Sequence, residues 1–205
     1  MQDLNKALAD IADIRLQLAA GTMFRGFGPT VIAATGGIAF GLTLLQTLWP
    51  DKLMTTPTAF VSTWIVAAVA SAALIGVEMY ARTRRHHSGL ADAMLFNAVE
   101  NFLPVGFAGA AIAIVILNYA PDTIWMLPGL WQLLVSLGLF AAIRFLPRAV
   151  AVAAAWYFVA GIAVLVFSSE ERSLSPWLMG LPFTIGQLLL AAVLHIAYGD
   201  DNAEV

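Results

Sequence analysis

Apolar residues follow one another in long blocks along this chain, and short groups of polar residues separate the blocks. Six blocks are long enough to form helices of about 20 residues, the length that crosses the hydrocarbon core of a bilayer. They cover approximately residues 30–49, 60–80, 98–118, 125–145, 149–167 and 176–198. The pattern therefore predicts an all-α, polytopic integral membrane protein in which residues 27–199 form a bundle of six transmembrane helices.

The composition agrees with this prediction and excludes several kinds of chemistry. Of the 205 residues, 60% are hydrophobic and 11% are charged, whereas a typical soluble domain has about 25% charged residues. The chain has no cysteine, which excludes disulfides, thiolate metal sites and cysteine nucleophiles. The net charge of −3 argues against nucleic acid as a partner, because nucleic-acid binding normally requires a basic surface.

The basic residues are distributed unevenly between the predicted loops, and cytoplasmic loops are enriched in Lys and Arg. If the N-terminus is cytoplasmic, only Lys52 and Arg172 of the ten basic residues lie outside. The eight inside are Lys6, Arg15, Arg25, Arg82, Arg84, Arg85, Arg144 and Arg148. This distribution predicts a multi-pass protein of the inner (cytoplasmic) cell membrane with both termini in the cytoplasm (N-in, C-in), residues 200–205 forming a short tail.

The segment before the first span has a helical pattern of its own. Leu4, Leu8, Ile11 and Leu18 recur at spacings of three, four and seven residues, which is typical of one face of a helix. We expect residues 1–26 to form an amphipathic helix on the cytoplasmic surface of the membrane. Because the segment carries three aspartates, it differs from the basic helices that bind anionic lipid. Docking on a protein partner through the same four residues is the alternative.

The third predicted span carries Glu100, the only carboxylate well inside an apolar helical run. Asn97 lies about one turn before it, Asn101 follows it directly, and Pro104 lies one turn after it, where a proline leaves the carbonyl of residue 100 without its helical donor. A buried acid here would be a candidate proton or cation site, with Pro104 as a hinge. The alternative is that the hydrocarbon core begins near Val99, which places Glu100 at the cytoplasmic interface.

Two glutamines, Gln132 and Gln187, lie within the fourth and sixth spans. Amides inside membrane bundles commonly form hydrogen bonds between helices, and we predict this role for both. If they converged with Glu100, the three side chains would instead form a polar path. Each glutamine follows a proline, Pro128 or Pro182, in a faintly similar stretch. Chance is the simpler explanation of this likeness, although duplication of helical hairpins would also produce it.

Small residues recur at every fourth position in each of the first two predicted spans. The positions are Ala33, Gly37 and Gly41 in the first span and Ala68, Ala72 and Gly76 in the second. Such small-xxx-small lines allow two membrane helices to approach closely. We therefore predict that these two spans pack on each other.

Neither a cofactor nor a catalytic site is expected. His86, His87 and His195 all fall near the predicted cytoplasmic face, where histidines are more often solvated or interfacial than bound to a metal. Trp64, Trp131 and Trp156 lie deep in their spans and are expected to pack rather than to form a ligand cage. The chain has no HExxH, GxSxG or P-loop motif. We therefore expect a protein that is not an enzyme.

Two functional hypotheses follow. The first is a binding, sensor or accessory module that contacts lipid, a second copy or another membrane protein. Its support is the amphipathic segment and the shortage of polar groups within the spans. The alternative is a small oligomeric transporter or channel that uses Glu100 as its proton or cation site. We favour the module, because transport usually requires more polar groups within the membrane than this chain has.

Overall fold

The computed structural model confirms the predicted class, since its described residues form a helical bundle with six helices long and apolar enough to span a membrane. It describes residues 28–85, 90–144 and 146–203, and for 82–85, 90–99, 101 and 198–203 it describes the backbone alone. No strand occurs within these ranges. The predicted N-terminal helix with its four apolar positions lies outside the described residues.

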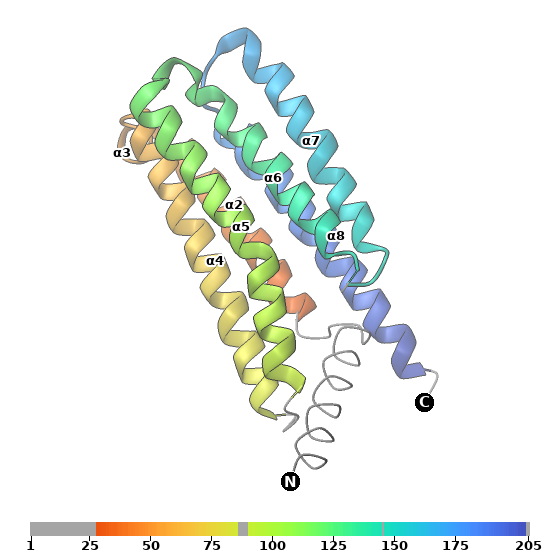
Figure 1. Cartoon of the computed structure of the whole chain (residues 1–205). Coiled ribbons are helices and arrows are strands. Elements are labelled where there is room, and N and C mark those ends of the chain that lie inside the picture. The colour runs from red at the N-terminus through yellow and green to blue at the C-terminus, as the bar shows by residue number, and fades with distance from the viewer. Residues whose placement is uncertain (1–27, 86–89, 145, 204–205) are drawn as a thin grey trace, which may run out of the picture.

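Six long helices carry the six apolar spans (Figure 1). They are α2 (Pro29–Leu48), α4 (Pro57–Arg85), α5 (Leu90–Tyr119), α6 (Leu127–Ala142), α7 (Val150–Glu171) and α8 (Pro176–Ala203). The short helix α3 (Pro50–Leu53) follows α2, and the 3-10 helix η1 (Pro121–Met126) leads into α6. Helix α7 continues beyond the fifth predicted span to Glu171, and Arg172 ends it in a left-handed conformation (φ 50°).

Proline explains where most of these helices begin. A proline stands at the first or second position of helices α2, α3, α4, η1, α6 and α8. Its fixed φ suits the first helical turn, where its missing N–H group has no helical partner to lose. Only Pro104 in α5 and Pro182 in α8 lie inside a helix. These two prolines each remove a backbone hydrogen bond within a span.

The six long helices run alternately up and down the bundle (Figure 1). We call the end where α2 begins the near end, and the end that holds α3 and η1 the far end. The most extensive contacts join α2 to α8 and α6 to α7, and α7 also packs on α8. Helix α4 packs mainly on α2, and α5 packs mainly on α6. The bundle therefore has a core of four helices with α4 and α5 beside it.

The buried apolar residues form two clusters at different depths. The near-end cluster joins α2, α6, α7 and α8 and includes Ile32, Val150 and Leu194. The far-end cluster joins α2, α4, α5, α6 and α8 and includes Trp64 and Leu127. Many members of both clusters are alanines, which let helix backbones approach closely where lipid provides no hydrophobic driving force between helices.

Glycines mark the closest approach of the main helix pairs. A Cβ added at Gly129 of α6 would lie 2.8 Å from the carbonyl oxygen of Gly161 on α7, and one added at Gly161 would lie 3.0 Å from the Gly129 carbonyl oxygen. Between α2 and α8, a Cβ at Gly36 would lie 3.1 Å from the Cβ of Gln187. Glycine is required at these contacts because the opposing atoms belong to, or adjoin, the partner backbone.

The predicted packing of the first two spans on each other is confirmed, since helices α2 and α4 are in contact. The small residues of the second line, Ala68, Ala72 and Gly76, are nevertheless exposed. A Cβ added at Gly37, Gly41 or Gly76 would meet nothing within 4 Å. Gly41 borders the groove between α2 and α4, whereas the line on α4 is exposed, so spacing alone did not identify the packed face.

Candidate functional site

Glu100 lies on the near half of α5 with its side chain exposed. The apolar span in this helix is Phe102–Tyr119, so Glu100 precedes it by two residues. Pro104 is inside the helix and exposed. Asn97 and Asn101 are helical, but their side chains lie outside the described part. The structure does not bring Glu100 together with the two glutamines. Gln132 is near the far-end start of α6 and is fully buried against α8, and Gln187 lies on α8, with which α5 has no extensive contact.

Gln132 is fully buried (0% exposed) between α6 and α8. Its Nε2 donates a hydrogen bond of 3.1 Å to the backbone carbonyl of Leu178. Leu178 is four residues before Pro182, which has no N–H to offer that carbonyl. The Gln132 amide therefore supplies the donor that the proline removes. The Oε1 atom of Gln132 is buried and has no hydrogen-bond partner among the described residues. This oxygen can still accept a hydrogen bond.

Two further donors from α7 reach α8 on the other side of the proline. Trp156 Nε1 donates to the carbonyl of Pro182 at 2.9 Å, and the Tyr157 hydroxyl donates to the carbonyl of Phe183 at 3.3 Å. The Tyr157 ring packs on the Phe183 ring, with centroids 5.5 Å apart, and presses against Gly186. The middle of α8 is therefore surrounded by polar contacts from α6 and α7.

Gln187 lies closer to the near end of the bundle than Gln132. It is nine residues beyond Leu178 on α8, a rise of about 13 Å, and its side chain is beside Tyr157. Its Oε1 is also buried without a hydrogen-bond partner among the described residues. The two glutamines therefore occupy different depths and do not form one site. Pro128 stands at the start of α6 and Pro182 stands inside α8, so the two similar stretches do not have equivalent positions.

A second polar network joins α2 to α4 near the far end. Gln46 is fully buried; its Oε1 accepts a hydrogen bond from Trp64 Nε1 at 2.9 Å, and its Nε2 donates to Thr63 Oγ1 at 2.7 Å. The Thr63 hydroxyl donates in turn to the carbonyl of Phe60 at 2.8 Å. Both ends of the Gln46 amide are satisfied, so this network is a fixed tie between the two helices.

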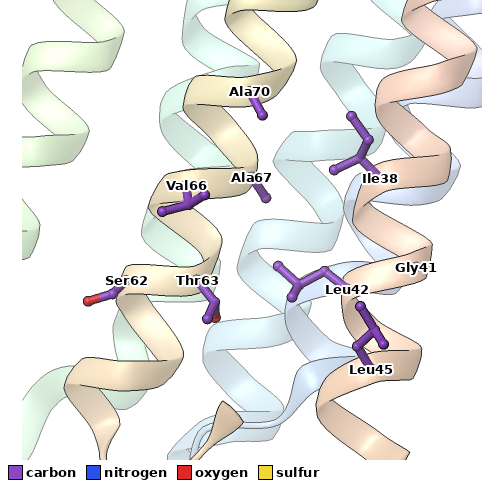
Figure 2. Close-up of a pocket in the computed structure, with 9 residues that line it drawn as sticks. All are labelled: Ile38, Gly41, Leu42, Leu45, Ser62, Thr63, Val66, Ala67 and Ala70. Atoms are coloured by element: carbon purple, nitrogen blue, oxygen red, sulfur yellow. The ribbon is translucent and has the colours of Figure 1, made fainter.

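The same two helices form the walls of a lateral groove with a volume of about 530 Å³ (Figure 2). Figure 2 shows the Leu42 side chain pointing across toward α4, and Ala67 and Ala70 presenting only methyl groups toward α2. The groove is lined by Ile38, Gly41, Leu42 and Leu45 of α2 and by Ser62, Thr63, Val66, Ala67 and Ala70 of α4. Almost all of this lining is apolar. The Ser62 hydroxyl points away (Figure 2) and donates to the carbonyl of Thr58.

The near end of the contact between α2 and α4 holds a carboxylate. The Glu78 side chain of α4 lies directly against Gly28, the residue that caps the start of α2. A carboxylate is favoured at this position, because the first N–H groups of a helix point toward it. The position was not identified from the sequence, since Gly28 and Glu78 are fifty residues apart.

The structure adds no candidate metal site to those considered from the sequence. His195 is an exposed residue of α8, and His86 and His87 lie outside the described residues. Among the residues that were described, no group of three or more His, Asp or Glu side chains is placed to hold a metal ion.

Reasoning from the sequence missed the polar role of the deep tryptophans. Each donates its indole N–H to another helix: Trp64 to Gln46, Trp131 to the carbonyl of Gly109, and Trp156 to the carbonyl of Pro182. The available signal was that a buried indole needs an acceptor.

Comparison of the chain with protein-family models, curated proteins and solved structures finds no match.

Proposed function

We propose that this chain is a non-enzymatic membrane protein that binds an alkyl chain, the tail of a lipid or lipid-like molecule, in the groove between α2 and α4. The groove is the observation that carries this proposal. Both of its walls belong to membrane spans, so the molecules that reach it are those dissolved in the bilayer. Its volume of about 530 Å³ falls within the range of about 300–1,000 Å³ that is usual for small-molecule sites.

The lining of the groove favours an alkyl chain as its occupant. Its α4 wall runs from Ser62 to Ala70, a rise of about 12 Å, and almost all of the lining is apolar. A hydrocarbon chain has no polar group that would need a hydrogen-bond partner in such a lining. The small residues Gly41, Ala67 and Ala70 leave space for a chain that lies along the two helices.

The buried polar side chains also favour a binding module over a transporter. In the part of the chain whose side chains are described, they are Thr35, Thr43, Gln46, Gln132, Ser136 and Ser168, and none is charged. Five of these six make a hydrogen bond to the chain itself with a side-chain donor. Such groups stabilise a bundle and offer no charged site for a proton or cation.

The test is photolabelling in nanodiscs that contain a phosphatidylcholine with a diazirine in the middle of one acyl chain. We expect labels to concentrate on the groove residues. Gly41→Leu should place a side chain in the groove, and nothing lies within 4 Å of its Cβ. The new side chain should replace on the order of ten carbon–carbon contacts between the alkyl chain and the groove, each worth about 0.1–0.2 kcal/mol. The loss of about 1–2 kcal/mol of binding free energy lowers labelling of the groove about 5- to 30-fold.

Gly76→Leu is the matched control. Gly76 also lies on open helix surface, but it is outside the groove on α4. Labelling of the groove should be unchanged in this variant. The proposal is contradicted if the wild-type groove is labelled no more than the exposed residue Val159 of α7, or if Gly41→Leu leaves its labelling unchanged.

A further inference from the structure

Pro182 divides α8 into two segments, and its surroundings differ on the two sides. On the far-end side, the carbonyl of Leu178 loses its helical donor to the proline, and Gln132 is the residue that donates to it. On the near-end side, the carbonyls of Pro182 and Phe183 accept from Trp156 and Tyr157. An unsatisfied carbonyl is costly within a bilayer, so a proline at this position needs a donor from another helix.

We propose that Pro182 is a hinge in α8 and that Gln132 is the latch that holds it. The far segment, residues 176–181, is held to α6 by the hydrogen bond that Gln132 donates to the Leu178 carbonyl, and Thr184, just beyond the proline, donates to the Gly180 carbonyl at 2.8 Å. The near segment is fixed by two donors from α7 and by the packing of Gly186 on Tyr157. Release of the Gln132 bond therefore removes the hydrogen bond that holds the far segment to α6, while the bonds that fix the near segment to α7 remain.

The far segment contacts residues that lead to the groove. Gly180 lies against Thr43 of α2, and a Cβ added there would be 3.1 Å from the ring of Trp64 on α4. Trp64 donates a hydrogen bond to Gln46, and Gln46 donates one to Thr63, a residue of the groove lining. Movement of the far segment would thus shift Trp64 and, through Gln46, the groove residue Thr63. The proposed hinge is inferred from the hydrogen bonds around Pro182 and does not depend on the proposed alkyl site.

A double-mutant cycle tests the pairing of Gln132 with Pro182. Pro182→Ala restores an N–H to the Leu178 carbonyl, so the Gln132 donor is no longer needed. We expect Gln132→Met to raise the unfolding equilibrium constant about 5- to 150-fold in the wild-type background and less than about 2-fold in the Pro182→Ala background. The assay is unfolding by SDS in mixed micelles, followed by circular dichroism. Equal effects in the two backgrounds would overturn the proposal.

Gln187→Met is the matched control for this cycle. It makes the same change at a second glutamine whose Oε1 is buried and which does not bond to Leu178. Its effect should be the same whether residue 182 is proline or alanine. A dependence on residue 182 as large as that of Gln132→Met would mean that the proline acts on the whole core, which also overturns the pairing.

A distance measurement tests the hinge without Pro182→Ala, in case that variant does not fold. Because the chain has no cysteine, spin labels can be placed at Trp177→Cys and Ile196→Cys alone. Both positions are exposed on α8, on opposite sides of the proline, about 28 Å apart by helical rise. We expect Gln132→Met to broaden the distance distribution and Gln187→Met to leave it unchanged. A distribution of equal width in the wild type and Gln132→Met would refute the latch.

Discussion

The contact between α6 and α7 permits a quantitative test of how this bundle is held together. An added Cβ at Gly129 would be 2.6 Å from Leu165 Cγ and 2.8 Å from the Gly161 carbonyl oxygen. The leucine can rotate away, but the carbonyl oxygen belongs to the backbone of α7. Gly129→Ala therefore forces the two helices apart at their closest point.

The effect of Gly129→Ala on the free energy of unfolding is the sum of two opposing contributions. Overpacking of a tight core typically costs about 1–3 kcal/mol, whereas replacing glycine by alanine in a helix gains about 0.4–1 kcal/mol by restricting the unfolded chain. Gly76→Ala on α4 isolates the second term, because its added Cβ meets nothing within 4 Å. We therefore expect Gly129→Ala to be less stable than Gly76→Ala by about 1–3 kcal/mol.

The assay is reversible unfolding by SDS in mixed micelles, with the free energy of unfolding compared among four alanine variants. Gly161→Ala should lower the free energy of unfolding slightly less than Gly129→Ala does, because the nearest contacts of its added Cβ are 2.9 and 3.0 Å. Gly109→Ala should behave like Gly76→Ala, because its nearest contact is an ordinary 3.5 Å. The reasoning is refuted if Gly129→Ala stabilises the protein as much as Gly76→Ala does.

Two other predictions concern the far-end network and the topology. Trp64→Phe keeps an aromatic ring but leaves the buried Oε1 of Gln46 without its donor, and it should cost about 1–3 kcal/mol; an unchanged midpoint of thermal unfolding would contradict this. For the predicted topology, Asp122→Cys and Glu170→Cys should react with an impermeant maleimide in intact spheroplasts, and Arg148→Cys only after permeabilisation. The reverse pattern would show that the predicted orientation is wrong.

The six spans could be predicted because the bilayer imposes a length on apolar blocks. The first predicted span, 30–49, corresponds to α2 (Pro29–Leu48). Helices α4 and α5 continue past their apolar blocks, since α4 runs to Arg85 and α5 begins at Leu90. Hydropathy detects the part of a helix that lies in hydrocarbon, and a polar helical end outside the membrane gives no such signal.

The packed faces could not be predicted from spacing. Gly37 and Gly41 fit the four-residue repeat, yet Gly36, one position away and about 100° around the helix, is the glycine that contacts α8. The hydrogen bond from Gln132 to the Leu178 carbonyl was equally hidden. A proline inside a helix indicates that a carbonyl needs a donor, but the identity of the donor depends on the register between two helices far apart in sequence.

The division of the bundle into four tightly packed helices and two looser ones bears on where function resides. About 33–39% of the residues in the spans of α2, α6, α7 and α8 are buried, compared with 17% in α4 and 11% in α5. Helix α4 is tied to α2 at both ends, by Glu78 against Gly28 at the near end and by the Gln46 network at the far end. The groove lies between these two ties, where Gly41, Ala67 and Ala70 have too little side chain to fill the space between the helices. Because an occupant would displace no part of the four-helix core, binding there requires the least rearrangement of the fold.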